Sequence, residues 1–276
     1  MKTRTIEKAI AAKVEAFAAT LPPELGDRVR KGTIVAGGCI ASMLLQEPVN
    51  DYDLYFTTQD LALDVARHFG ATRGLEAQLY EGRITFGAHG NRAQFVPDNT
   101  GEDPDPDAEP KTEEDSKRTP PFSPLFITNN AISLTSKTQL VIRFWGTPEE
   151  ILRNFDYVHC TNYWSAETGL HLNAEALTSL LTKELRYVGS LYPLCSLIRL
   201  RKFLKRGFTC NAGQMLKMMF QVSRLDLADI RTLQDQLIGV DSVYFISLIG
   251  QLREMQEAGT AIDGSVICEA VDRIFG

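Results

Sequence analysis

The sequence predicts an α+β fold, in which a mixed β-sheet flanked by helices is followed by an all-α C-terminal region. Residues 31–170 hold short β-branched and aromatic runs separated by turn residues, whereas apolar residues recur at helical spacing from Ala174 onward. The chain has 276 residues and 44% hydrophobic content, enough to bury one large core or two small ones. We therefore expect an N-terminal helix in residues 1–30, a head domain in 31–170 and a helical domain in 171–276.

Each element follows from its local pattern. We expect strands at Thr33–Ala36, Asp51–Phe56, Leu75–Tyr80, Arg83–Phe86, Arg92–Val96, Leu125–Thr128, Ala131–Leu134, Thr138–Trp145 and Phe155–Trp164. We expect helices at Cys39–Leu45, Asp60–Phe69, Ala174–Leu181, Pro193–Arg206, Ala212–Arg224, Leu227–Leu237, Ser242–Glu257 and Val266–Phe275. Thr147 is a suitable N-cap for one more short helix, because Pro148 fits its first position and the two following glutamates favour its positive end.

The most informative segment runs from Ile34 to Phe56. Twelve residues separate Gly38, the second glycine of a pair, from an Asp-Tyr-Asp sequence. On the expected strand Asp51 and Asp53 lie at i and i+2, so their carboxylates point to the same face. Two such oxygen ligands suit Mg²⁺, which is commonly held by one or two carboxylates together with substrate phosphates.

The paired glycines complement the acids. Without a Cβ, Gly37 and Gly38 let the backbone approach a triphosphate, and the N–H groups at the start of the following helix favour anionic oxygen. The alternative is a βαβ turn whose acids sit at a solvated strand end.

These residues resemble the head domain of the DNA polymerase β nucleotidyltransferase superfamily, most closely the branch of bacterial poly(A) polymerases and CCA-adding enzymes. The branch pattern GGxVRDxLLGxPxxDxD can be laid on Gly37 to Asp53 without a gap. The matching residues are Gly37, Gly38, Ile40, Leu44, Leu45, Pro48, Asp51 and Asp53. The Arg-Asp pair of the pattern is Ala41-Ser42 here, and its next glycine is Gln46.

The resemblance implies a nucleotidyltransferase head that uses two Mg²⁺ ions and an NTP, with ATP favoured. It implies that Asp51 and Asp53 carry the ions, and that Gly37, Gly38 and Ser42 contact phosphate. No covalent enzyme intermediate is needed. The four histidines form no Ser/His/Asp or HExxH arrangement that would favour nucleophilic hydrolysis or zinc chemistry.

A third carboxylate is expected from Asp156. Polymerase-β-like heads often add one from a neighbouring strand, and no acid lies in Thr138–Trp145. In the poly(A) polymerase and CCA-adding branch, the Asp of an RRDFTxNA segment contacts substrate, and Arg153, Phe155 and Asp156 loosely resemble it. Asp156 is therefore a candidate catalytic, metal-binding or substrate residue, with a purely structural acid as the alternative.

A basic helix follows in the C-terminal region. Arg199 and Lys202 lie at i and i+3 of the expected helix, where they could bind triphosphate or an RNA backbone, or simply form a solvated face. Leu185–Gly189 and Ile198–Phe208 resemble the neck of the same branch, but Ser190–Ser196 lacks the Glu-Asp-x-x-Arg template that selects C and A. Templated CCA addition is therefore disfavoured.

The acceptor that we expect is an RNA 3′ end. A protein or a small molecule as acceptor is the alternative, since toxins and oligonucleotide synthases of the superfamily use these. A catalytically inactive nucleotide- or RNA-binding homologue is the other alternative, because the Arg-Asp pair is missing.

Charge and composition indicate where the acidic residues lie, the state of the thiols and the expected location of the protein. The net charge is −6, and residues 97–121 alone hold nine acids and three bases, so the rest of the chain is formally neutral. This proline-rich segment predicts a flexible acidic insertion, either a solvated loop or a shield for nucleic acid near the site. The five cysteines are scattered, no apolar run reaches 18 residues, and the first 21 residues fit an amphipathic helix. We expect reduced thiols, no membrane partner and a cytoplasmic location, and the sequence leaves the oligomeric state open.

Overall fold

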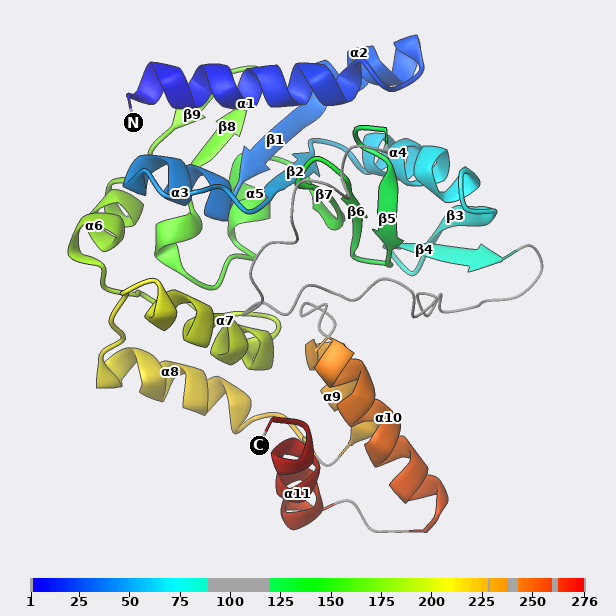
Figure 1. The fold of residues 1–276 in the computed structure, drawn as a ribbon, viewed down its shortest axis with the longest axis vertical. Coiled ribbons are helices and arrows are strands. Elements are labelled where there is room, and N and C mark those ends of the chain that lie inside the picture. Colours follow the sequence, from blue (N-terminus) through cyan, green and yellow to red (C-terminus); the bar gives the residue numbers. More distant parts are fainter. Residues whose placement is uncertain (1, 89–119, 228, 238–242, 260–262, 276) are drawn as a thin grey trace. The chain divides into compact units, whose positions relative to one another are not determined.

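The computed structural model describes residues 2–88, 120–227, 229–237, 243–259 and 263–275 (Figure 1). The described chain divides into two compact units, one up to Thr182 and one from Lys183 onward. The first unit is α+β and the described part of the second is helical, so the predicted fold class is confirmed. The expected strand Arg92–Val96 and residues 97–119 of the acidic insertion lie outside the described residues.

The first unit alternates helices with short strands along its chain. In chain order its elements are α1 (Thr3–Ala18), α2 (Pro23–Gly32), β1 (Thr33–Ala36), α3 (Gly38–Leu45), β2 (Tyr52–Phe56), α4 (Gln59–Ala71), β3 (Leu75–Tyr80), β4 (Arg83–Ala88), β5 (Pro124–Ile127), β6 (Ala131–Leu134), β7 (Thr138–Trp145), α5 (Pro148–Leu152), the 3₁₀ helix η2 (Val158–Cys160), β8 (Tyr163–Ser165), β9 (Gly169–His171) and α6 (Ala174–Thr182).

Seven of these strands form one mixed sheet in the order β5-β6-β7-β2-β1-β8-β9, and β3 and β4 form a separate hairpin. Strands β2 and β7 pair in parallel, whereas every other neighbouring pair of the large sheet is antiparallel. Strand β1 leads into the glycine turn and strand β2 carries Asp53, and both lie in the interior of the sheet. Side chains alternate between the two faces of the sheet, and this alternation decides which cluster each residue joins.

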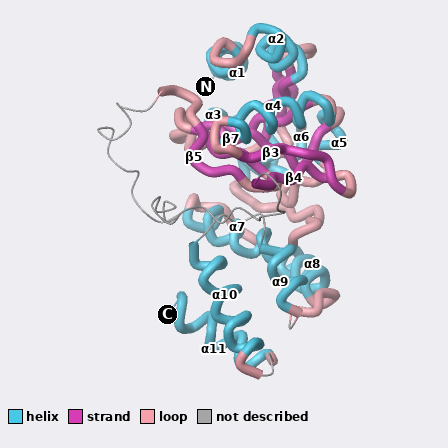
Figure 2. The backbone as a smooth tube through the Cα atoms, turned by 90° about the vertical axis from the view of Figure 1, so that its right-hand side faces the viewer, coloured by secondary structure: helices cyan, strands magenta, loops and turns pink. Residues whose placement is uncertain are grey.

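The two faces differ in their cover. Val35, Leu54 and Leu140 point to the large hydrophobic core, which includes buried residues of α1 and α4. Figure 2 shows α1 and α2 together on one side of the strands. The opposite face carries a smaller buried cluster that includes Tyr55 and, from α5, Ile151. Asp53 has the same parity as Tyr55 on β2, so it points to this second face, in the half-buried first part of the strand.

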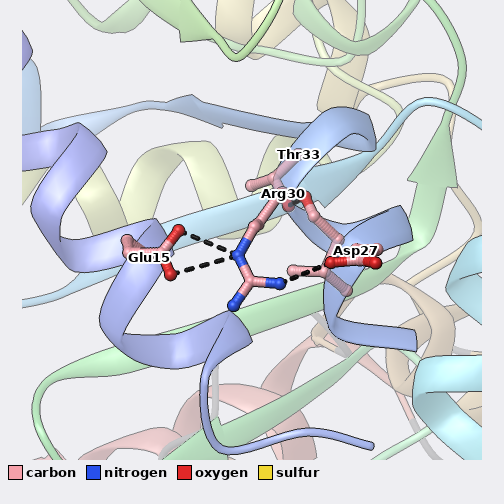
Figure 3. Close-up of polar contacts among 5 residues, drawn as sticks. Glu15, Asp27, Arg30 and Thr33 are labelled. Atoms are coloured by element: carbon pink, nitrogen blue, oxygen red, sulfur yellow. Dashed lines mark hydrogen bonds and ion pairs between the residues drawn. The ribbon is translucent and has the colours of Figure 1, made fainter. Parts of the chain in front are cut away.

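Arg30 fixes the approach of the chain to β1 (Figure 3). Its Nε lies 2.9 Å and 3.1 Å from the two carboxylate oxygens of Glu15 on α1, and a terminal nitrogen donates to Asp27 at 2.7 Å. The Thr33 hydroxyl donates to the Val29 carbonyl at 2.7 Å across the junction of α2 and β1. Such exposed ion pairs contribute only about 0–1 kcal/mol, so their main effect is to orient α2.

The short helix α5 has the N-terminus that its sequence predicts. Thr147 Oγ1 accepts from the Glu150 amide at 3.3 Å, and the Glu150 carboxylate accepts from the Thr147 amide at 2.8 Å, which completes a capping box. The helix places Ile151, which is fully buried, against the second face of the sheet.

Thr147→Ala should lower the free energy of unfolding by about 1 kcal/mol, because an alanine cannot accept the helix amide. Thr147→Ser keeps the acceptor and should remain within about 0.5 kcal/mol of the wild type. Urea denaturation followed by circular dichroism measures both values. Equal losses in the two variants would contradict this account of the helix start.

The predicted strand Phe155–Trp164 is wrong over most of its length. Residues 155–162 are irregular apart from η2 and an isolated bridge at Tyr157, and only Tyr163–Ser165 is a strand. Side-chain hydrogen bonds to the backbone explain the difference, because the Thr161 hydroxyl donates to the Val158 carbonyl at 2.7 Å and the Asn162 side chain accepts from the Asn173 amide at 2.9 Å. Asp156 therefore does not lie on a strand.

The second unit contains five helices among its described residues. They are α7 (Pro193–Lys205), α8 (Ala212–Val222), α9 (Ile230–Leu237), α10 (Val243–Glu257) and α11 (Gly264–Phe275). Leu233, Leu252 and Ala270, from the last three helices, form a buried cluster with Leu194 and Ile198 of α7 packed against it. Within the described part of the chain, no helix is long and apolar enough to cross a membrane.

Candidate nucleotide site

The turn between β1 and α3 depends on Gly37. Its backbone has φ +91° and ψ −149°, a conformation that is essentially restricted to glycine. A Cβ built on Gly37 would lie only 3.0 Å from Oδ2 of Asp53. The Gly37 amide donates to the Cys160 carbonyl at 3.3 Å, which ties the turn to η2. The absence of a side chain is therefore what admits the Asp53 carboxylate beside the turn.

Strand pairing places Asp53 in the middle of the sheet. Asp53 is opposite Ala36 on β1 and Gln139 on β7, so the acid lies between the end of β1 and the start of β7. Asp51 immediately precedes β2 and is exposed, whereas Asp53 is half-buried. The structure thus brings together Gly37 and Asp53, which the sequence separates, and places Asp51 at the solvent side of the same segment.

The pKa of the Cys39 thiol is affected by both Asp51 and Asp53. The thiol is buried in the first turn of α3, and its pKa is raised well above the ordinary value by burial first, then by the negative charges of Asp53 and Asp51. Both carboxylates are therefore within electrostatic reach of one point at the start of α3. Cys160 adds a smaller effect in the same direction.

This shift predicts a loss of stability at high pH. A thiol with a raised pKa in the folded state contributes stability below its unfolded pKa of about 8.5, and that contribution is lost as the pH rises toward the folded value. Between pH 8.5 and 10 the wild type should therefore lose more unfolding free energy than Cys39→Ala. Urea denaturation at the two pH values measures the difference, and identical losses would show that Cys39 does not resist ionisation.

The first turn of α3 is open at Gly38. A Cβ built there meets nothing within 4 Å, and the first turn contains no acidic residue. The N-terminal N–H groups of a helix favour an anionic oxygen, so this backbone suits phosphate. Ser42, one turn further along α3, is 6% exposed, so it lies beneath the surface of the helix.

Asp156 lies in the loop that faces the glycine turn. The ring of Phe155, its neighbour, lies 3.9 Å from the position of a Cβ on Gly37 and packs on Tyr55 with 6.0 Å between ring centroids. Asp156 itself is buried, with 7% of its surface exposed. Within the described ranges, no group of three or more His, Cys, Asp or Glu side chains is arranged to hold a metal ion. The role of Asp156 as a third site carboxylate stays a prediction.

Arg199 and Lys202 are placed on α7 of the second unit. Both lie within the helix Pro193–Lys205, with Arg199 half-buried and Lys202 exposed. The i, i+3 spacing that the sequence predicts is therefore present. Their contact with phosphate stays a prediction.

Two contacts of the site were not anticipated. Gln139 is the residue of β7 beside Asp53, and its amide donates to Ser133 Oγ at 3.5 Å. Phe155 packs over the glycine turn. Alternation along Thr138–Trp145 could have assigned Gln139 to a face, but its position beside Asp53 depends on a parallel register between strands distant in the sequence.

Comparison with known proteins places the chain in a family. The family model described as Gabija anti-defense 2 matches residues 8–183. The chain belongs to the Gabija anti-defense 2 family. The match spans nearly all of the first unit, including the glycine turn, both acids and the Asp156 loop. No curated protein matches the sequence.

Solved structures of tRNA-processing enzymes are similar at low identity. The Thermotoga maritima CCA-adding enzyme complexed with tRNA is 15% identical, with a TM-score of 0.41, over 84% of this chain and 48% of that one. A tRNA-processing enzyme in an apo form is 14% identical, with a TM-score of 0.40, over 93% of this chain and 58% of that one. The Bacillus stearothermophilus CCA-adding enzyme in complex with CTP is 12% identical, with a TM-score of 0.36, over 84% and 49%.

The chain thus spans about half the length of these enzymes. At these scores the likeness carries no argument about activity. The chemistry of this Gabija anti-defense 2 family member must therefore follow from its own residues.

Proposed function

We propose that this protein is a Mg²⁺-dependent nucleotidyltransferase, which transfers NMP from an NTP to an acceptor hydroxyl and releases pyrophosphate. The observation that carries the proposal is the contact between the Asp53 carboxylate and the side-chain-free face of Gly37. It joins an acid that can hold a cation to a backbone turn that can accept phosphate. Neither feature alone would indicate a nucleotide site.

The donor set fits Mg²⁺. Asp51 and Asp53 offer hard carboxylate oxygens two residues apart in the sequence. Because Asp51 is exposed, it leaves room for phosphate and water ligands. We propose these two residues as the metal ligands, with Asp156 as the third carboxylate. When bound, two Mg²⁺ ions would lower the pKa of the acceptor hydroxyl and offset the charge that develops on pyrophosphate.

The other residues of the site would position the nucleotide. Gly37 and Gly38 would admit the triphosphate to the first turn of α3, and Ser42 would support that turn as a further phosphate contact. Arg199 and Lys202 of α7 would neutralise charge on the leaving group or on an RNA backbone. ATP is the NTP that we favour.

Two acceptors follow from different observations. The basic helix α7 supports an RNA 3′ hydroxyl, because phosphate contacts supply affinity without sequence choice. Membership in an anti-defense family supports a protein acceptor, with the proteins of the Gabija defence system as its targets.

Labelling separates these possibilities. The protein is incubated with each α-labelled NTP and Mg²⁺, once with total cellular RNA and once with the purified Gabija proteins. Label is expected on one acceptor with wild type and with Asp60→Asn, a control that changes an exposed carboxylate on α4. No label on RNA, protein or small molecules would favour the inactive homologue and contradict the proposal.

A further inference from the structure

Gln139 lies beside Asp53 on the same face of the sheet. Strand β7 runs parallel to β2, and Gln139 is the register partner of Asp53. The following residues of β7 alternate as a strand requires, since Leu140 belongs to the large core and Val141 packs against the cluster of the second face. Gln139 has the parity of Val141 and therefore points, like Asp53, to the second face.

The Gln139 amide is hydrogen-bonded through its nitrogen. Its Nε2 donates to Oγ of Ser133, the register partner of Gln139 on β6, at 3.5 Å. Among the residues that the structure describes, the amide oxygen Oε1 has no hydrogen-bond partner, and the side chain is half-buried. An amide oxygen can accept two hydrogen bonds, so Gln139 offers an acceptor to a polar group that enters from solvent.

Gln139 and the glycine turn lie on opposite sides of Asp53. On one side Asp53 pairs with Ala36 of β1, which leads into the turn. On the other side it pairs with Gln139 of β7. Neighbouring strands are about 4.8 Å apart, so each partner is one strand spacing from the acid. The glutamine side chain is one carbon longer than that of aspartate, so its amide can reach past the Asp53 carboxylate.

An in-line transfer gives these two sides different roles. The attacking oxygen and the leaving pyrophosphate lie on opposite sides of the phosphorus that is transferred. The proposed phosphate contacts of Gly37 and Gly38 are on the β1 side of Asp53, which leaves the β7 side for the acceptor. A hydroxyl group there would meet the amide oxygen of Gln139.

We propose that Gln139 binds the acceptor hydroxyl and orients it toward the α-phosphorus. This assignment rests on the proposed function. The hydroxyl would donate to Oε1 as the acceptor binds. Its oxygen would then form the new bond to the α-phosphorus, and the electron pair of the broken phosphorus–oxygen bond would leave with pyrophosphate. The hydroxyl proton would pass to water, because a neutral amide does not take up a proton at neutral pH.

Two substitutions at Gln139 test this role. Gln139→Leu keeps the approximate size of the side chain and removes the acceptor oxygen, so kcat/KM for the acceptor should fall by about tenfold, the effect of one hydrogen bond. Gln139→Glu keeps an oxygen that accepts from the hydroxyl and can also take its proton, so kcat/KM should stay within about threefold of wild type or exceed it. Gln78→Leu, which changes an exposed glutamine on β3, is the matched control and should keep the wild-type value.

Initial rates at low acceptor concentration measure kcat/KM. Total cellular RNA is the acceptor in one arm, and the purified proteins of the labelling experiment are the acceptors in the other.

A second measurement does not depend on turnover. It determines the Mg²⁺ concentration that gives half-maximal binding of a fluorescent non-hydrolysable ATP analogue. Gln139→Leu should leave this concentration unchanged within about twofold, because the amide contacts the acceptor. Gln139→Glu should lower it by at least about threefold, because a further carboxylate beside Asp53 attracts the cation.

Three results would overturn the assignment of Gln139 alone: wild-type kcat/KM in Gln139→Leu, equal losses in the leucine and glutamate variants, or an unchanged Mg²⁺ requirement in Gln139→Glu. Circular dichroism and urea midpoints compare the folding of the variants. If Gln139→Leu does not fold, the Mg²⁺ requirement of Gln139→Glu decides. A wild type that labels neither RNA nor protein would overturn the proposed function together with this assignment.

Discussion

Asp53→Asn is expected to reduce nucleotidyl transfer by about 1,000-fold or more while the protein stays folded, and Asp51→Asn is expected to do the same. The amide keeps the size of the side chain but removes the negative charge that a divalent cation requires. Cation stabilisation of transition-state charge contributes several kcal/mol, and about 4 kcal/mol corresponds to this factor.

Initial rates of label transfer at saturating NTP and Mg²⁺ measure this effect. Asp60→Asn, on the exposed face of α4, is the matched control and should keep the wild-type rate. Asp156→Asn tests the third carboxylate under the same conditions. Rates within tenfold of wild type for both Asp51→Asn and Asp53→Asn would show that these acids do not carry the reaction.

Gly37→Ala should have the second large effect, about a 100-fold loss of transfer with a fall of about 1–3 kcal/mol in unfolding free energy. Alanine is strained at φ +91° and ψ −149°, and its Cβ would lie 3.0 Å from the Asp53 carboxylate. Relief of that contact moves the carboxylate or the turn, and misplacement by about 1 Å can cost 100-fold in rate.

Gly38→Ala is the internal comparison for the glycine turn. A Cβ at Gly38 meets nothing within 4 Å, and alanine is favoured over glycine within a helix, so stability should stay unchanged or rise slightly. Thermal denaturation and transfer rates are measured for both variants. Equal stability of Gly37→Ala and Gly38→Ala would contradict the role assigned to the turn.

The sequence predicted the fold where local patterns are strong. The strands around Gly37 and Asp53, the helix after the turn and the Thr147 cap are present because glycine pairs, strand alternation and capping residues act over a few positions. The parallel pairing of Asp53 with Gln139 was not predictable, since that register depends on packing between strands distant in the sequence.

The segment after α5 shows why one prediction failed. Tyr157, Val158, His159 and Cys160 are typical of a strand by composition. The side chains that follow them bind backbone groups instead, Thr161 that of Val158 and Asn162 that of Asn173, and these bonds replace the extended conformation.

The most direct test of the account is whether Mg²⁺ and nucleotide bind together at the glycine turn. A fluorescent non-hydrolysable ATP analogue is titrated against wild type and Asp51→Asn/Asp53→Asn, each with Mg²⁺ and with EDTA. Wild type should bind the analogue at least about tenfold more tightly with Mg²⁺, and the double variant should show no such gain. An equal gain in both proteins, or no binding to wild type, would contradict the assignment of this site.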